Sequence, residues 1–364
     1  MCSTAKGPVA IMNESDIQTL VQQIPDPVLE RTLGALKMVK QVTVENGTAT
    51  VRIELPAHAY PKRAELEQLI SDKIKSGSDI ESVNVQFDVV TRGKKSGARI
   101  GLRVKNVIAV GSGKGGVGKS TMAASLAFGL KHLGATVGLL DADVYGPSIP
   151  TMAGVHGQPA VLEFTTSDGQ TVQRIEPLDA DGLKLMSIGF MIPEEQAVIW
   201  RGPMLHKILT QFLQQTEWGE LEYLIIDMPP GTGDVSLTLS QMLGLAGAVV
   251  VCTPQQVALL DAVKAISMFN QVKIPVLGMV ENMSGPIFGS GGVKKRAEEL
   301  KVPFLGEIPI DATIRIKGDE GGIAALFAED SPVRDSLLKV VENVSMEIVR
   351  NLQDEPDMPQ LEIL

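Results

Sequence analysis

The segment 111–120 reads Gly-Ser-Gly-Lys-Gly-Gly-Val-Gly-Lys-Ser and directly follows the apolar run Val107–Val110. It contains the spacing Gly-x-x-x-x-Gly-Lys-Ser, whose glycines let backbone N–H groups close around phosphate oxygens. In this pattern the lysine reaches the β- and γ-phosphates, the serine gives an oxygen to Mg²⁺, and the next helix directs its positive end at the anion. The segment therefore requires a strand before it and a helix after it. The predicted phosphate-binding residues are Gly113, Gly115, Gly116, Val117, Gly118, Lys119, Ser120 and Thr121.

Carboxylates stand at the ends of two further apolar runs. Asp141 and Asp143 end one of them, and ligands of open α/β sheets bind at the carboxyl ends of the strands. Asp227 ends the other, in the pattern that holds Mg²⁺ through water. It leads into Pro-Pro-Gly-Thr-Gly-Asp, where the N–H of Gly231 is expected to contact a γ-phosphate. Together with the glycine-rich loop, these residues predict a site for Mg²⁺ and a nucleoside triphosphate such as ATP.

From residue 106 onward, the apolar runs do not alternate with polar residues, and stretches with helical spacing separate them. Strands of this kind are buried on both faces, which indicates a mostly parallel sheet with helices on either side. We therefore expect a doubly wound α/β domain over residues 106–352, followed by a loose tail over 353–364. The apolar runs are 107–110, 136–140, 223–226, 248–251, 275–280 and 303–305.

Residues 12–91 have a different pattern, in which short segments alternate between apolar and polar residues. Asn13 is a plausible helix cap, and Asn46-Gly47 between two alternating segments is a strong hairpin signal. The pattern predicts a small α+β domain in which two helices pack on a three-stranded sheet. We expect helices over 14–23 and 61–75 and strands over 39–45, 48–55 and 82–90.

Charge and hydropathy exclude several classes of protein. The 364 residues carry a net charge of −10, and a diffusely acidic surface disfavours binding to nucleic acid or to an anionic membrane. No segment has the run of about 18 apolar residues that a membrane span needs, and the N-terminus lacks the apolar stretch of a secretory signal. We therefore expect a cytoplasmic protein. The stretch 92–105 holds six basic residues and no acid, and is interpreted as a solvated linker, with a phosphate-contacting arm as the alternative.

Lys114, directly after the first glycine of the motif, is not required by the general phosphate-binding pattern. With it, the loop resembles the deviant P-loop of the MinD/ParA-like ATPases. Further segments resemble the Mrp/ApbC branch of these ATPases, which is described as ATP-dependent iron–sulfur cluster carriers. The N-terminal part resembles the small MIP18-like domain often fused ahead of that branch. The resemblance covers residues 12–330, and its segments are 141–148, 200–204, 227–234 and 280–284, with 26–29 and 38–40 in the N-terminal part.

The resemblance implies a slow ATP hydrolase that acts as a nucleotide-switched homodimer. Its partners would be cluster donors and the apoproteins that receive iron–sulfur clusters. It also implies that Lys119 and Lys114 bind phosphates, with Lys114 reaching those of the partner subunit. Ser120 and Asp227 would position Mg²⁺.

Roles for five further residues follow from the same resemblance. Asp143 would orient the attacking water, and Asp141 would support it from behind. Asn282 would read the edge of the adenine, and the segment from Pro309 to Asp311 would pack near the base. Catalysis in such a site consists mainly of positioning and charge neutralisation.

The chain departs from the family pattern at its cysteines. The family's Cys-x-x-Cys pair, contributed by both subunits to a bridging cluster, follows the Glu-Asn-Met-Ser stretch, whereas here Ser284 is followed by Gly-Pro-Ile-Phe-Gly-Ser-Gly-Gly. Tyr60 stands where the N-terminal loop often carries a cysteine. Only Cys2 and Cys252 are present. Cys252 ends an apolar strand and is expected to be a buried small hydrophobe, and Cys2 lies on a terminal arm that is poorly preorganised for a ligand.

Three hypotheses follow. The first is an ATPase that carries or assembles iron–sulfur clusters, through unexpected ligands or by moving clusters held by a partner. The second is a nucleotide-switched adaptor that holds no cluster, for which the missing cysteines argue. The third is a DNA- or membrane-positioning ATPase, against which the net charge and the lack of a basic amphipathic C-terminal helix argue.

Overall fold

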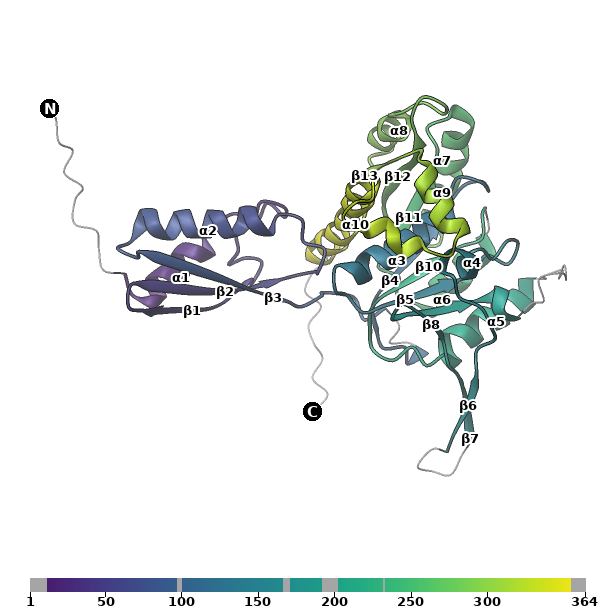
Figure 1. Ribbon diagram of the computed structural model, residues 1–364, viewed down its shortest axis with the longest axis horizontal. Coiled ribbons are helices and arrows are strands. Elements are labelled where there is room, and N and C mark those ends of the chain that lie inside the picture. The colour runs from purple at the N-terminus through teal and green to yellow at the C-terminus, as the bar shows by residue number, and fades with distance from the viewer. Residues whose placement is uncertain (1–11, 97–99, 166–170, 192–201, 232, 355–364) are drawn as a thin grey trace. The chain divides into compact units, whose positions relative to one another are not determined.

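The computed structural model describes residues 12–96, 100–165, 171–191, 202–231 and 233–354. The chain forms two compact units, Met1–Arg92 and Gly93–Leu364. Each is described by itself (Figure 1).

The first unit is a three-stranded sheet covered by two helices, which confirms the predicted architecture. Asn13 caps the first helix, because its side chain accepts a hydrogen bond from the Asp16 N–H at 3.0 Å. Asn46 and Gly47 both have positive φ, which the tight hairpin turn between the first two strands requires. The third strand pairs in parallel with the second. The elements are α1 (Glu14–Gln22), β1 (Val39–Glu45), β2 (Thr48–Leu55), α2 (Arg63–Gly77) and β3 (Ser82–Val89).

The second unit is built on a sheet that has eight strands among the described residues. Their order is β13-β12-β11-β4-β10-β5-β9-β8, and every pairing is parallel except that of β8 with β9. The six predicted apolar runs all lie in this sheet, and the carboxyl ends of β4, β5 and β10 meet at one edge. The strands are β4 (Val104–Gly111), β5 (Val137–Asp141), β8 (Leu178–Ala180), β9 (Leu183–Ser187), β10 (Leu221–Asp227), β11 (Gly247–Cys252), β12 (Val276–Ser284) and β13 (Phe304–Pro309).

Helices cover both faces of this sheet, as the doubly wound fold requires (Figure 1). Helices α3 and α10 pack on one face, while α5, α6, α7 and α8 close the main hydrophobic core on the other. The residues of the central strands β4, β5, β10 and β11 are almost all buried on both sides, which is the reason for their unbroken apolar runs. The helical elements are α3 (Lys119–His132), α4 (Ile149–Ala153), η2 (Ile188–Met191), α5 (Gly202–Gln215), α6 (Gly233–Met242), α7 (Gln256–Gln271), α8 (Gly292–Leu300), α9 (Ala312–Asp319), η3 (Ile323–Phe327) and α10 (Arg334–Asp354).

The structure differs from the sequence-based expectation at several boundaries. Strand β4 begins at Val104, inside the stretch interpreted as a linker, and α10 extends to Asp354, inside the expected tail. Two further pairs of strands were not expected: β8 with β9 at one end of the sheet, and the antiparallel hairpin β6 (Val161–Thr165) and β7 (Thr171–Ile175). In the described part of the chain, no helix is long and apolar enough to cross a membrane.

Candidate active site

The glycine-rich loop lies between β4 and α3, where a phosphate-binding loop must lie. Gly116 and Gly118 have φ of 78° and 81°, a region that favours glycine. Two of its glycines are also required by space. A Cβ atom at Gly113 would lie 2.1 Å from the backbone of Asp261 in α7, and one at Gly118 would lie 2.1 Å from Nδ2 of Asn282. The loop is therefore fixed from two sides.

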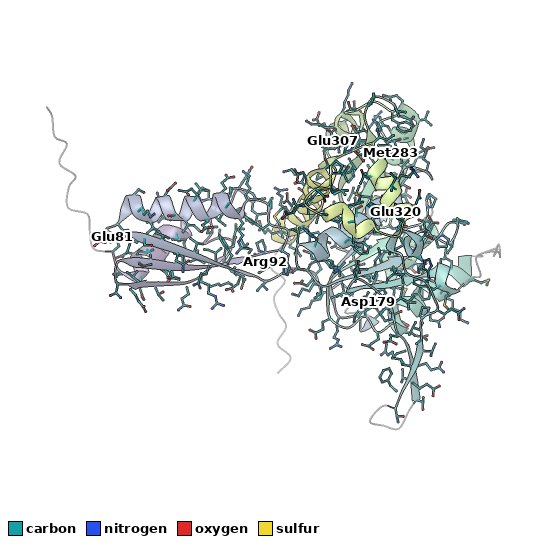
Figure 2. All side chains as sticks on the ribbon, in the orientation of Figure 1. Glu81, Arg92, Asp179, Met283, Glu307 and Glu320 are labelled. Carbon is teal, nitrogen blue, oxygen red and sulfur yellow. The ribbon has the colours of Figure 1, made fainter. Side chains whose placement is uncertain are left out.

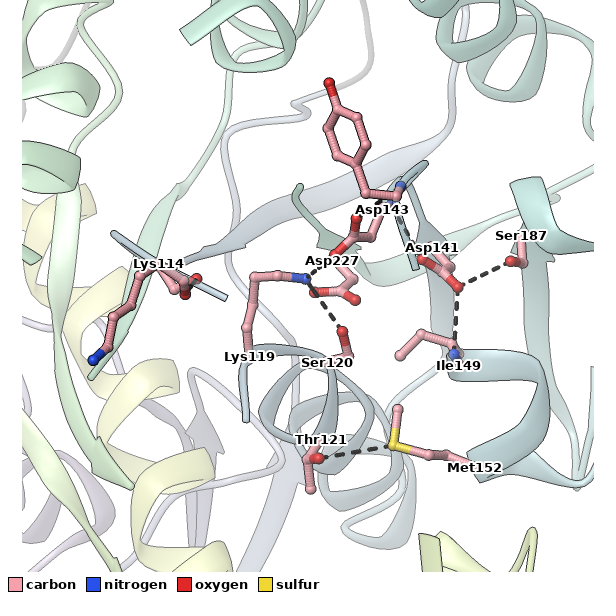
Figure 3. Close-up of polar contacts among 12 residues, drawn as sticks. Lys114, Lys119, Ser120, Thr121, Asp141, Asp143, Ile149, Met152, Ser187 and Asp227 are labelled. Carbon is pink, nitrogen blue, oxygen red and sulfur yellow. Dashed lines mark hydrogen bonds and ion pairs between the residues drawn. The ribbon is translucent and has the colours of Figure 1, made fainter. Parts of the chain in front are cut away.

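Lys119 lies between two carboxylates at the base of the loop (Figure 3). Its Nζ atom is 2.5 Å from Oδ1 of Asp227 and 3.2 Å from Oδ2 of Asp143, and all three side chains are buried. The ammonium also lies 3.2 Å from the Ser120 hydroxyl. Burial raises the pKa of Asp227, and the Lys119 charge opposes that rise. The fold thus gathers Lys119, Ser120, Asp143 and Asp227 in one place.

Asp141 is fully buried at the end of β5 and holds three segments together. Its carboxylate accepts hydrogen bonds from the Asp143 N–H at 3.1 Å, the Ile149 N–H at 3.3 Å and the Ser187 hydroxyl at 2.9 Å. Burial, together with the nearby Asp227 carboxylate, raises the pKa of Asp141 to about 8. Asp141 therefore fixes the backbone of Asp143 from behind rather than facing the P-loop lysine.

Mg²⁺ fits the donor set at the end of β10. The Oδ2 atom of Asp227 is buried and has no hydrogen-bond partner, and a carboxylate oxygen of this kind is a preferred ligand of Mg²⁺ or of its bound water. The Ser120 hydroxyl, at the start of α3, is the second oxygen of the expected pair.

Lys114 and Gly231 differ from the core of the site. The Lys114 side chain points away from the carboxylates that Lys119 contacts (Figure 3), and it is partly exposed. The N–H of Gly231 donates to the Ser112 carbonyl at 3.3 Å, so the N–H expected to meet a γ-phosphate is bonded to the P-loop strand. Thr232 and the segment 192–201 lie outside the described residues, and with them part of the 200–204 motif.

A cavity of about 540 Å³ opens beside the P-loop helix. Asn282 lies at its edge and donates from Nδ2 to the Val117 carbonyl at 2.9 Å, which ties β12 to the P-loop. Asp311 caps α9 by accepting from the Thr313 N–H at 2.7 Å, and this bonding to Thr313 lowers the pKa of Asp311. The size and the mostly apolar wall of this cavity suit a nucleobase. It is lined by Gly118, Thr121, Met152, Asn282, Met283, Pro309, Ile310, Asp311, Ala312, Ile314, Arg315, Gly318 and Asp319.

The segment that lacks the cysteine pair forms a tight turn after β12. Gly285 and Gly289 exchange two backbone hydrogen bonds, of 2.8 and 2.7 Å, and Ile287 between them is exposed. Glu281, fully buried in β12, accepts from the Gly291 N–H at 2.7 Å and the Val293 N–H at 2.8 Å. Both ends of the turn are therefore fixed by hydrogen bonds.

Cys252, the cysteine that lies among the described residues, offers no exposed thiolate. Cys252 is buried, as expected, and its Sγ donates to the Thr253 carbonyl at 3.2 Å. Burial raises the pKa of the Cys252 thiol to about 12. Cys2 lies outside the described residues, within which no group of three or more His, Cys, Asp or Glu side chains could hold a metal ion. Tyr60, at the N-terminal cysteine position, donates to the buried Asp26 carboxylate at 2.7 Å instead.

Three contributors to this site were missed by the sequence analysis. Ser187 ends β9 and supports Asp141, Met152 in α4 lines the cavity, and Glu281 holds the start of α8. Only Glu281 had a local signal, because a carboxylate inside an apolar run is costly unless it is paired. Ser187 and Met152 acquire their roles only when distant segments meet in the fold.

A parallel doubly wound sheet, a P-loop between strand and helix, and a buried lysine with two carboxylates define a P-loop nucleoside triphosphatase. Comparisons with known proteins specify the class further. The family model described as NUBPL iron-transfer P-loop NTPase matches residues 103–345, and the model of an iron–sulfur cluster assembly protein matches residues 14–87. The chain therefore belongs to the family of NUBPL-type iron-transfer P-loop NTPases, with an iron–sulfur cluster assembly domain ahead of it, as the motifs had indicated.

Individual relatives agree with this assignment. The chain is 42% identical over 347 residues to the iron–sulfur cluster carrier protein of Haemophilus influenzae, covering 92% of each chain. It is 44% identical over 262 residues to the iron–sulfur cluster transfer protein NUBPL of Dictyostelium discoideum, covering 69% of this chain and 77% of that one. Among solved structures, the nucleotide-binding protein of Archaeoglobus fulgidus in complex with ADP is 38% identical with a TM-score of 0.52, covering 63% of this chain and 93% of that chain.

Proposed function

We propose that this protein binds and hydrolyses ATP with Mg²⁺ and uses the nucleotide cycle to carry or assemble iron–sulfur clusters for apoprotein clients in the cytoplasm. The observation that carries the proposal is the buried ion cluster under the P-loop, in which Lys119 contacts both Asp227 and Asp143. The names of the relatives support iron–sulfur clusters as the cargo. The ADP-bound relative supports the nucleotide.

The site residues divide the chemistry among them. The N–H groups of the P-loop and the Lys119 ammonium hold the phosphates, and Lys119 exchanges its carboxylate partners for them when nucleotide binds. Ser120 and Asp227 would hold Mg²⁺, which neutralises phosphate charge when bound. Asp143 orients the water for attack. Asp141 keeps Asp143 in place, because it accepts a hydrogen bond from the Asp143 N–H. The cavity lined by Asn282, Pro309 and Asp311 receives the adenine.

A homodimer closed by ATP is the working form in this proposal. Lys114 is partly exposed and points away from its own carboxylates, as a residue that reaches a partner's phosphates must. Exposed apolar side chains occur on the segments that carry the site: Tyr145 stands two residues after Asp143, and Val257 and Leu260 are 66% and 60% exposed on the first turns of α7, the helix whose Asp261 lies against Gly113. Such side chains are typical of a face that another chain covers.

The cluster ligands do not fit the usual set. Iron–sulfur clusters are held mainly by thiolates and in some centres by imidazoles, and Cys252 is buried with a raised thiol pKa. This observation favours a second candidate function, in which the same nucleotide-switched dimer moves clusters held by a partner or acts as a cluster-free adaptor. In both cases the ATPase and its switch are the same.

Anaerobic reconstitution with iron and sulfide separates the two functions, with the Cys2→Ser and Cys252→Ser variants run alongside. A stoichiometric cluster that one substitution removes supports the carrier and identifies its ligand. No iron or labile sulfide, with ATP hydrolysis intact, supports the adaptor. Absence of ATP hydrolysis in a chain that binds no ADP would contradict both.

A further inference from the structure

Gly154 and Gly321 bring two distant parts of the second unit into backbone contact. Gly154 ends α4 with φ of 65°, and Gly321 follows α9 with φ of 71°. A Cβ atom at Gly154 would lie 2.7 Å from the carbonyl oxygen of Gly321, and one at Gly321 would lie 2.6 Å from Cα of Gly154. Any side chain at either position would push α4 and α9 apart.

The other end of α4 is hydrogen-bonded to Asp141, the carboxylate that fixes the backbone of Asp143. The N–H of Ile149, the first residue of α4, donates to Oδ2 of Asp141 at 3.3 Å. The Asp143 N–H donates to Oδ1 of the same carboxylate at 3.1 Å. A displacement of α4 therefore acts on the group that fixes the backbone of Asp143.

Helix α9, on the far side of the glycine contact, forms a wall of the base cavity. Ala312, Arg315, Gly318 and Asp319 of this helix line the cavity. Met152 of α4 lines it too; its Cγ would be 3.7 Å from a Cβ atom at Gly318, and its sulfur accepts from the Thr121 hydroxyl at 3.8 Å. Figure 2 labels one residue from each side of this region: Met283 lies at the end of β12 and lines the cavity, and Glu320 lies between α9 and Gly321.

We propose that Gly154 and Gly321 are positioning residues through which an adenine in the cavity controls the placement of Asp143. The base orders α9, the glycine contact passes that order to α4, and Asp141 passes it to Asp143. Nucleotides without a well-seated base would therefore be hydrolysed slowly even when their phosphates bind. This inference rests on the proposed ATP hydrolysis and adds a coupling to it.

Hydrogen exchange tests the coupling without any turnover. ADP should slow amide exchange in residues 149–155 of the natural chain, whereas pyrophosphate should not. Gly321→Ala should lose this protection while still binding ADP. Gly47→Ala is the matched control, because Gly47 has φ of 76° with no atom near its Cβ position and lies in the first unit. Equal protection by pyrophosphate, or retained protection in Gly321→Ala, would overturn the inference.

Kinetics supply the second readout. The natural chain should hydrolyse ATP faster than inorganic tripolyphosphate, and Gly321→Ala should lower kcat for ATP by about ten- to a hundredfold, the effect of a small misplacement of a catalytic group. Its kcat for tripolyphosphate should fall much less, because that substrate has no base to order α9. An equal loss for both substrates would indicate general damage and contradict the coupling. A natural chain that binds ADP but hydrolyses neither substrate would refute the proposed hydrolysis, while the exchange experiment still decides the coupling.

Discussion

Replacing Lys119 with methionine tests the ion cluster under the P-loop. Methionine keeps the length of the side chain but removes the ammonium, which leaves the buried Asp227 and Asp143 carboxylates facing each other across the site. Removing one partner of a buried ion pair costs about 3–5 kcal/mol because the remaining charge is uncompensated. We expect the free energy of unfolding of the second unit to fall by that amount in the absence of nucleotide, in addition to the loss of ATP binding.

The assay is urea unfolding at pH 7 followed by tryptophan fluorescence. Both tryptophans, Trp200 and Trp218, belong to the second unit, so the signal reports that unit. The double variant Lys119→Met with Asp227→Asn should recover most of the lost stability, because it removes a carboxylate along with the ammonium. It should not recover ATP binding, since the lysine is needed for the phosphates.

The pH dependence of the same variant gives an independent check. Without Lys119, the folded-state pKa of Asp227 rises further above its value in the unfolded chain. Stability is then lost as pH increases through that window, because the folded state binds more protons than the unfolded state. The deficit of Lys119→Met should be smaller at pH 5 than at pH 7. A variant as stable as the natural chain at pH 7, or a deficit independent of Asp227, would refute this reasoning.

Three further predictions concern neighbouring residues. Lys114→Ala should leave the Kd for ATP, measured by calorimetry, within about twofold of the natural value. It should slow hydrolysis and weaken the ATP-dependent dimer, which light scattering measures. A loss of ATP binding equal to that of Lys119→Ala would show that Lys114 binds the phosphates of its own subunit and not those of the partner subunit. Asp141→Asn should remove a fall in unfolding free energy between pH 5 and pH 8, because the raised pKa of Asp141, about 8, makes the folded state retain a proton that the unfolded chain releases; parallel stability curves for the two proteins would contradict this. Glu281→Ala should lower the unfolding free energy by about 1–3 kcal/mol, because it leaves two backbone N–H groups without partners, and Glu281→Gln should lose less.

Local patterns predicted most of the strands and the phosphate loop. The Asn46-Gly47 hairpin and the apolar runs that became β4, β5, β10, β11, β12 and β13 each depend on neighbours in sequence, so their signals were visible in the chain. β9 was missed because its five residues include Lys184 and its place beside β5 depends on a long connection. The hairpin of β6 and β7 was missed because most of its residues face solvent and only Ile175, at its end, is buried, so its sequence carries little apolar pattern.

The site was predicted where chemistry is encoded locally and missed where it depends on packing. The carboxylates at the ends of β5 and β10 could be found because parallel strands bring their carboxyl ends to one edge. The support of Asp141 by Ser187, and the approach of Gly154 to Gly321, join residues separated by long stretches of chain. No local spacing records such a contact, so these residues required the folded structure.

The buried Glu281 has a consequence for how this protein family can vary. Its carboxylate fixes residues 291 and 293 at one end of the turn after β12, and the strand itself fixes the other end. Residues between two such anchors can change in number at little cost, because doubling the length of a loop costs only about 0.6 kcal/mol. The segment where the family pattern would place a cysteine pair is thus an insert that can be exchanged while β12 and α8 stay fixed. A lineage could gain or lose metal ligands there without refolding the P-loop domain beneath it.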